Sequence, residues 1–289
     1  MAWPGFTEHL EPLSDIDIGW SMGGSGPPLL LLHGFPQTRA LWAKIAPVLA
    51  EDFTVICPDL RGYGVSGKPG PVSAYTFREM ARDQVALLAH LGFERCAVAG
   101  HDRGGRVGHR LALDHPECVT TLCVMDIIPT HTLLADLRQD VAHAYYHWFF
   151  LAQPEPVPER LIAADPDFYY ESCLAGWGKA GLDQFDSDQL EHYRTSWNDP
   201  EVIRGMCNDY RATILHDFDE DAKDIGRRLA CPLHVLYGQD GVMAKQFDFA
   251  QCWAPRADRM QTLGLPGGHF FIDTHPEPAR RALQALLKV

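Results

Sequence analysis

Six short, mostly apolar runs recur along the chain and predict the strands of a largely buried sheet. Most of them are rich in Leu, Val and Ile at successive positions, which is typical of parallel strands with helices packed on both faces. The runs cover residues 29–32, 54–57, 96–99, 122–125, 233–237 and 260–263. Helical patterns lie between most of them. This alternation predicts an open, doubly wound α/β sheet, in which ligands bind beyond the carboxyl ends of the strands.

Residues 76–91 form the clearest predicted helix. Thr76 and Glu79 have the spacing of a capping box, in which each side chain satisfies a backbone N–H at the helix start. Apolar side chains then recur with a spacing of about 3.6 residues, and Gly92 ends the pattern. The segment therefore predicts one amphipathic helix packed against the sheet.

The alternation stops between residues 130 and 222, where aromatic side chains are frequent and no strand is predicted. Strand patterns resume at residue 233. We therefore expect a helical insertion that lies over the carboxyl edge of the sheet as a cap and excludes water from a site beneath it. The predicted organisation is a core of residues 1–129 and 223–289, interrupted by a cap of residues 130–222.

The composition is that of a globular protein, and the net charge argues against some classes of binding partner. With 289 residues, 46% hydrophobic and 22% charged, the chain can bury a large core. Its formal net charge of -13 repels nucleic acid and anionic membranes, so neither is expected as a partner. The eight cysteines are scattered without a C-x-x-C pair, and no apolar run approaches the roughly 20 residues that span a bilayer. We expect a cytoplasmic protein that acts on a small molecule.

Residues 62–67 match the G-x-G-x-x-G pattern that binds dinucleotides. That motif requires a helix to open within it, directly after a strand. Here Pro69 and Pro71 follow at once, and proline does not propagate a helix. The segment is therefore predicted to be a loop without a nucleotide site.

The segment from Gly100 to Gly105 has the pattern of a nucleophile elbow. An apolar run leads into a glycine-flanked turn and then a helix, and Asp102 occupies the position at which many hydrolases carry serine. The glycines allow a strained turn that raises the side chain above the edge of the sheet. The alternative is that Asp102 merely caps the following helix, which is a common role of aspartate.

An acid and a histidine follow Asp102 in the order of a catalytic triad on this type of sheet. Asp126 ends one predicted strand, and His269 lies in a glycine-rich loop after the last strand. Asp240 also follows a strand and is an alternative acid. Either aspartate could instead stabilise a turn.

Several motifs together resemble those of the haloacetate (fluoroacetate) dehalogenases, a family of the α/β-hydrolase superfamily. The resemblance extends from about residue 29 to the C-terminus. The first two segments are shared widely in the superfamily, whereas the Asp-Arg-x-x-Arg and His-Trp segments are narrower. The matching segments are Leu32-His-Gly-Phe-Pro36, Asp59-Leu-Arg-Gly-Tyr-Gly-Val-Ser66, Gly100-His-Asp-Arg-Gly-Gly-Arg106, Asp126-Ile-Ile-Pro-Thr130, His147-Trp-Phe-Phe-Leu-Ala-Gln-Pro154 and Gly268-His-Phe270.

The resemblance implies an α/β-hydrolase fold and a hydrolytic dehalogenation. Asp102 would displace halide from carbon and form an ester, because an aspartyl ester is later hydrolysed whereas a serine ether is not. The family places its acid after the strand that follows the elbow, which favours Asp126, and His269 would then activate the attacking water. Backbone N–H groups of Phe35 and Arg103 are expected to stabilise the oxyanion.

Arg103 and Arg106 indicate the kind of substrate. They lie three residues apart at the start of one predicted helix and therefore share a face. Two cations beside Asp102 would bind a substrate carboxylate and offset its repulsion from the nucleophile, whereas a neutral substrate would gain nothing. We therefore expect a small 2-haloacid, with fluoroacetate or chloroacetate as the first candidates. The alternative explanation is a solvated basic helix end or structural ion pairs.

The resemblance assigns halide binding to His147, Trp148 and Tyr210, each of which offers an N–H or O–H donor. Aromatic residues in a cap more often serve packing, and epoxide hydrolases use such a tyrosine to protonate an alkoxide. Trp177 is a weaker candidate for the pocket wall. Relatives often carry aromatics where this chain has His131 and Leu133, so entry to the pocket is expected to differ.

No cofactor is required by this mechanism, and no metal site is predicted. His143 and His147 have i, i+4 spacing, but no further metal-ligand motif accompanies them. The expected partner is a small anionic substrate, and the resemblance also implies a homodimer. Two other functions stay open: an epoxide hydrolase with the same nucleophile, and a catalytically silent ligand receptor of the same fold.

Overall fold

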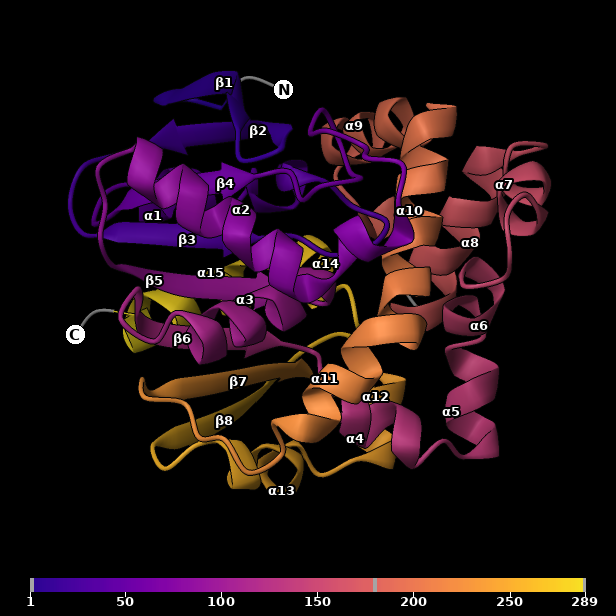
Figure 1. The fold of residues 1–289 in the computed structure, drawn as a ribbon. Helices are drawn as coiled ribbons and strands as arrows, with labels where there is room; N and C mark the ends of the chain where they lie inside the picture. Colours follow the sequence, from indigo (N-terminus) through magenta and orange to yellow (C-terminus); the bar gives the residue numbers. More distant parts are fainter. Residues whose placement is uncertain (1–2, 179–180, 288–289) are drawn as a thin grey trace.

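The computed structural model describes residues 3–178 and 181–287, and the side chains of residues 177 and 178 are not described. An eight-stranded sheet forms its centre (Figure 1). The strand order is β1-β2-β4-β3-β5-β6-β7-β8; β1 and β2 are antiparallel to their neighbours, and the remaining strands are parallel. The strands are β1 (Phe6–Leu13), β2 (Ile16–Gly23), β3 (Pro28–Leu32), β4 (Thr54–Pro58), β5 (Cys96–His101), β6 (Val119–Met125), β7 (Leu233–Gly238) and β8 (Met260–Leu265).

All six predicted strands are present within the described residues. Strands β1 and β2 were not predicted from the apolar runs, because β1 alternates exposed and half-buried positions and β2 mixes polar residues with apolar ones. The expectation of burial on both faces is wrong for β8. This strand lies at the edge of the sheet, the side chains of Gln261 and Thr262 are exposed on its two faces, and the side chain of Leu263 is 43% exposed.

Helices cover both faces of the sheet, and each face has its own hydrophobic core. Alternate side chains of β3 enter opposite cores: Leu30 and Leu32 pack with α2 and α3, whereas Leu29 and Leu31 pack with α1 and α15. One half of the predicted capping box of α2 is confirmed: the Thr76 hydroxyl accepts a hydrogen bond from the Glu79 N–H, whereas the Glu79 carboxylate accepts one from Arg82. These elements and the shorter ones are η1 (Arg39–Trp42), α1 (Ala46–Leu49), η2 (Val72–Tyr75), α2 (Phe77–His90), α3 (Arg103–Asp114), α12 (Val242–Gln246), α13 (Phe249–Trp253), η5 (Ala254–Arg256), α14 (Phe271–Thr274) and α15 (Pro276–Leu287).

A helical segment between β6 and β7 lies beyond the carboxyl ends of the parallel strands, on the right of Figure 1. Among all described residues, no helix is long and apolar enough to cross a membrane. The segment contains α4 (Thr130–Ala135), α5 (Gln139–Ala144), α6 (His147–Leu151), α7 (Val157–Ile162), α8 (Pro166–Gly178), η3 (Leu182–Gln184), α9 (Ser187–Trp197), α10 (Pro200–Ala212), η4 (Thr213–Asp217) and α11 (Phe218–Lys223).

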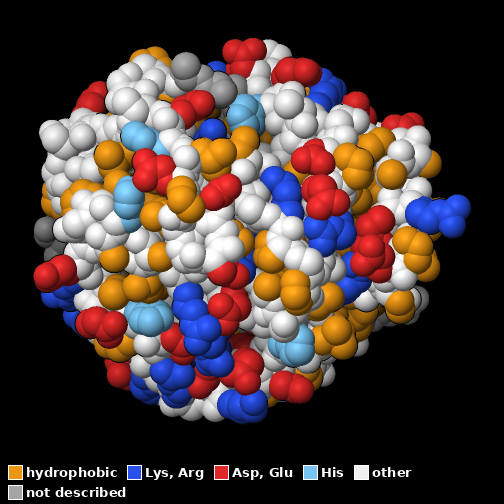
Figure 2. Space-filling view, turned by 45° about the horizontal axis from the view of Figure 1, so that its top comes forward, with side chains coloured by type: hydrophobic (Ala, Val, Ile, Leu, Met, Phe, Trp, Pro, Cys, Tyr) orange, Lys and Arg blue, Asp and Glu red, His pale blue; other side chains and the backbone are white. Residues whose placement is uncertain are grey.

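The glycine-rich segment 62–67 forms turns rather than the start of a helix, as predicted. Gly62 has a φ of 87°, and helix α10 packs closely against it. A Cβ added at Gly205 would lie 2.6 Å from the Gly62 carbonyl oxygen, so glycine at this position lets the helical segment approach the core loop. On the face shown in Figure 2, acidic and basic side chains are interspersed.

Candidate active site

The turn between β5 and α3 raises Asp102 at the carboxyl edge of the sheet. Asp102 has φ 48° and ψ -115°, which is strained for a residue with a side chain. Any side chain at Gly100 would collide with the backbone of Gly104, so the sequence must place glycine there for the turn to close. Asp102 makes no side-chain hydrogen bond to the helix that follows, which contradicts the helix-cap alternative.

The carboxylate of Asp102 is buried and ionised. Its Oδ1 accepts a hydrogen bond from the Phe35 N–H at 3.0 Å, and its Oδ2 lies 3.8 Å from His269 Nε2. Burial by itself raises the pKa of this carboxyl, but the nearby His269, His101 and arginine charges outweigh it and lower the pKa to about 2. Asp102 is therefore a carboxylate at neutral pH without any base to deprotonate it.

The structure brings Asp126 and His269 together beside Asp102. Asp126 Oδ2 lies 2.7 Å from His269 Nδ1, and Asp126 Oδ1 accepts the Gly238 N–H at 3.0 Å. Burial lowers the pKa of His269, but the hydrogen bond and charge of Asp126 hold it above its ordinary value of 6.5. Asp240 instead accepts the N–H of Gly267 at 3.1 Å, so it stabilises the loop that carries the histidine.

Exchanging each of these two acids for asparagine separates their roles. Asp126→Asn is expected to lower turnover by roughly 10³–10⁴-fold, because the amide no longer holds the His269 tautomer that accepts a proton at Nε2. Asp240→Asn is expected to change turnover by less than about fivefold, since its amide oxygen still accepts the Gly267 N–H. Halide release measured under matched conditions checks both variants. A larger loss in Asp240→Asn would contradict the assignment of Asp126.

Both predicted arginines are buried next to the nucleophile, but they differ in what they bind. Arg103 donates through Nε and Nη2 to the carboxylate of Asp209 on α10, and Nη2 also donates to Thr213. Arg106 donates through Nη1 to the Ile128 carbonyl at 3.0 Å and to the Thr130 hydroxyl at 2.9 Å. The expected pair of free guanidinium forks is therefore not what the structure shows, because Asp209 already occupies the fork of Arg103.

Each arginine retains one buried N–H group without a partner among the described residues: Nη1 of Arg103 and Nε of Arg106. Burial lowers the pKa of Arg106 to about 10, so it stays a cation at neutral pH. Two unsatisfied cationic donors in a buried site favour an anionic ligand. Asp209 was missed in the sequence, where its only signal is its place directly before the predicted Tyr210.

The three predicted halide-binding side chains form one aromatic cluster over the site. Tyr210 lies 5.5 Å from both His147 and Trp148, measured between ring centroids. The guanidinium of Arg103 lies 4.4 Å from the centroid of the Tyr210 ring, and that of Arg106 lies 4.8 Å from Trp148. Within the described part of the chain, the buried Tyr210 hydroxyl has no hydrogen-bond partner. The side chain of Trp177 lies outside the described residues.

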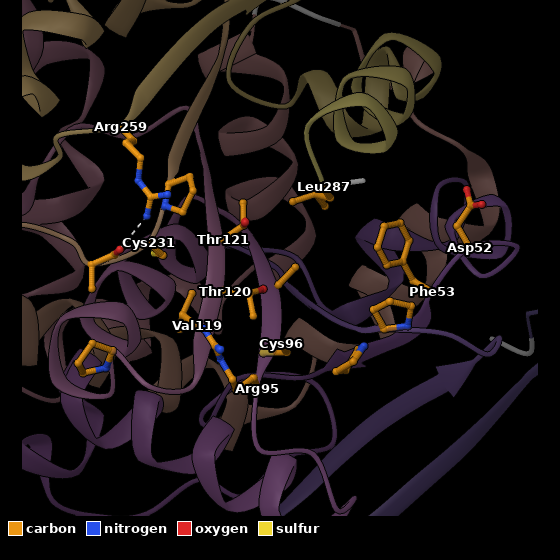
Figure 3. A pocket seen from close by; sticks show the side chains of 16 residues that line it. Asp52, Phe53, Arg95, Cys96, Val119, Thr120, Thr121, Cys231, Arg259 and Leu287 are labelled. Carbon is orange, nitrogen blue, oxygen red and sulfur yellow. Dashed lines mark hydrogen bonds between the residues drawn. The ribbon is translucent and has the colours of Figure 1, made fainter. Parts of the chain in front are cut away.

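A separate groove of about 750 Å³ lies at the opposite edge of the sheet (Figure 3). It is lined by the amino ends of β3, β5 and β6, including Pro28, Cys96 and Val119, and by Arg95 and Arg259. Among the predicted site residues whose side chains are described, none lines it. The predicted site at the carboxyl edge of the sheet is therefore separate from this groove.

Comparison with known proteins agrees with the geometry. The family pattern of the alpha/beta hydrolase fold matches residues 27–276. A fluoroacetate dehalogenase from Burkholderia sp. is 52% identical over 98% of this chain and 94% of its own length. The chain belongs to the haloacetate (fluoroacetate) dehalogenase family of the α/β hydrolases. Both the resemblance stated from the motifs and the predicted fold class are thereby confirmed.

This family assignment sits within a wider group of hydrolases. A soluble epoxide hydrolase from Corynebacterium sp. (strain C12) is 31% identical over 94% of this chain and 93% of its own length. The crystal structure of a Nostoc sp. PCC 7120 protein, which is described as an α/β hydrolase, superimposes with a TM-score of 0.96. Its sequence is 42% identical, and the match covers 99% of both chains. Members of this family are enzymes, and the chain is a hydrolase by the same evidence.

Proposed function

We propose that the protein hydrolyses small 2-haloacids, such as fluoroacetate or chloroacetate, to the 2-hydroxy acid and halide. The observation that carries the proposal is an ionised Asp102 at the elbow, beside two buried guanidinium groups that each retain an N–H without a partner among the described residues. A carboxylate nucleophile suits an alkylating substrate, because the ester it forms is hydrolysed in turn. The two cationic donors suit a substrate that carries a carboxylate.

In the first step, Oδ2 of Asp102 attacks the carbon that bears the halogen, and the carbon–halogen electron pair leaves as halide. His147, Trp148 and Tyr210 would donate hydrogen bonds to the departing ion in a dry site. The proposed cap, residues 130–222, excludes the water that would compete with Asp102. His269 takes no part in this step, since the nucleophile already carries its charge.

In the second step, His269 removes a proton from a water that attacks Cγ of the Asp102 ester. The oxyanion develops on Oδ1, which already accepts the Phe35 N–H at 3.0 Å. The N–H of Arg103 starts helix α3 and is free of intrahelical bonding, which suits it as second donor. Collapse of the intermediate expels the hydroxy acid, whose oxygen takes the proton from His269, and Asp102 is restored.

A panel of substrates tests the proposal. We expect stoichiometric halide, measured by ion chromatography, from fluoroacetate or chloroacetate and from 2-halopropionates, because each presents a carboxylate to the arginine donors. Styrene oxide is the contrasting substrate, since it is neutral. A second candidate activity is epoxide hydrolysis, which is favoured by the Tyr210 hydroxyl, unpartnered among the described residues, and by the epoxide hydrolase relative; diol formation would reveal it. Diol without halide would overturn the dehalogenase proposal, and binding of haloacetate without turnover would indicate a silent receptor.

A further inference from the structure

A chain of buried hydrogen bonds connects helix α9 to the backbone of His269. The Tyr193 hydroxyl donates to Oδ1 of Asp273 at 2.8 Å, and Nε2 of Gln37 lies 2.5 Å from Oδ2 of the same carboxyl group. His101 joins the other end of the chain. Its Nδ1 lies 3.2 Å from Gln37 Oε1, and its Nε2 lies 2.8 Å from the carbonyl oxygen of His269.

This chain of hydrogen bonds crosses the interface between the helical segment and the sheet. Tyr193 comes from α9, Asp273 from α14, and Gln37 from the loop after β3, whereas His101 ends β5 directly before the nucleophile. These four side chains are at most 5% exposed. Polar groups buried in this way fix a unique arrangement when every donor meets an acceptor. The proposed mechanism assigns no task to any of them.

His101 restricts how the protons of the chain are distributed. The His269 carbonyl only accepts, so the hydrogen of a neutral His101 must lie on Nε2. Burial lowers the pKa of His101 to about 4, so the ring is neutral at pH 7 and its Nδ1 accepts. The amide N–H₂ of Gln37 then has to face His101, so the nitrogen and oxygen of this amide exchange the places given above, which a half-turn of the amide achieves.

With Gln37 in that orientation, its carbonyl oxygen faces Asp273 and needs a donor. Burial raises the pKa of Asp273 to about 7, which makes the protonated acid accessible near neutral pH. The acid O–H then donates to Gln37, Gln37 donates to His101, and His101 donates to the His269 carbonyl. Tyr193 still donates to the other oxygen of Asp273. Each hydrogen bond along this neutral chain then joins one donor to one acceptor.

We propose that this chain, from Tyr193 to His101, positions His269 and makes hydrolysis of the ester depend on the docking of helix α9. His269 has to stand 2.7 Å from Asp126 and turn Nε2 towards Asp102, although it follows two glycines in its loop. A hydrogen bond to its backbone carbonyl restricts that freedom. The inference rests on the proposed function, in which only the second step uses the histidine.

Single-turnover kinetics on the full-length protein tests this separation of steps. In Asp273→Leu, the halide burst is expected to stay within about twofold of the wild-type rate. Decay of the alkylated protein is expected to slow by about 10- to 100-fold, the cost of misplacing a catalytic group. Intact mass spectrometry follows the ester, and ion chromatography follows the burst. Tyr193→Phe, which removes one hydrogen bond and keeps the packing, is expected to show a smaller loss in the same step.

Two further variants distinguish positioning from general damage. Asp273→Asn retains a donor towards Gln37 and an acceptor for Tyr193, so ester decay is expected to recover to within about threefold of wild type. Tyr170→Phe is the matched control: its ring packs on Trp197, as the ring of Tyr193 does, and its buried hydroxyl has no partner among the described residues. It is expected to leave both steps unchanged.

A readout without substrate makes failure of this inference distinguishable from failure of the proposed function. The proton between His269 Nδ1 and Asp126 is expected to give a low-field NMR signal in the wild type. The signal should shift or broaden in Asp273→Leu and stay in place in Asp273→Asn and Tyr170→Phe. An unchanged signal in Asp273→Leu, or an equal fall of burst and ester decay, would overturn the positioning chain. Absence of halide from the wild type would refute the proposed function alone.

Discussion

Replacing His269 with asparagine is expected to stop the reaction after halide has left, with Asp102 alkylated. The first step needs only the ionised carboxylate, so one equivalent of halide should still be released. The second step loses the base that activates water, which typically contributes about 10²–10⁴-fold to a rate. The ester should therefore accumulate to nearly one per chain.

Intact mass after exposure to haloacetate, followed by mapping of the peptide that contains Asp102, measures this accumulation. His234→Asn is the control, because this histidine lies on β7 and is outside the proposed site. It should turn over normally and carry no adduct. Unmodified protein in His269→Asn after halide release would show that the histidine is not the base of the second step.

The same assignment predicts that the two steps respond differently to pH. Asp102 has a pKa of about 2, so the halide burst should be constant down to mildly acidic pH. His269 must be neutral to accept a proton, and its pKa is held above its ordinary 6.5 by Asp126. Ester hydrolysis should therefore fall as pH falls through that raised value, and the ester should accumulate in acid.

Replacing Asp102 with alanine is expected to abolish both steps. The loss should be about 10⁴–10⁶-fold in turnover, the order seen when a nucleophile or its partner is removed from a catalytic triad. Binding should survive, because the arginine donors remain and the repulsion between Asp102 and the substrate carboxylate is gone. Calorimetric titration of Asp102→Ala with chloroacetate is expected to give an affinity at least as high as that of the wild type for the same substrate.

Oxygen labelling of the wild type gives the complementary result. In a single turnover in ¹⁸O-water, the label is expected in the carboxyl group of Asp102, because water attacks Cγ and not the substrate carbon. Mass spectrometry of the peptide locates it. Label found only in the hydroxy acid would mean that water displaces halide directly, and would exclude the ester.

The core of the fold and the place of the nucleophile could be predicted from local sequence. Parallel strands in the interior are covered on both faces, so they leave continuous apolar runs, and the elbow needs glycine where a side chain would collide. Strands β1 and β2 left no such run, because β1 is a partly exposed edge strand and β2 mixes polar residues with apolar ones. Local patterns report burial and steric limits, which are properties of short segments.

The partners of the charged groups were decided by the tertiary structure. Asp126 and Asp240 have similar sequence contexts, and only the arrangement of strand ends brings Asp126 to His269. Asp209 binds the guanidinium group of Arg103 because the fold brings α10 next to the elbow. The link between Gln37 and Asp273 joins residues at opposite ends of the chain. Such pairings depend on distances between segments that are remote in sequence, which no local pattern of side chains encodes.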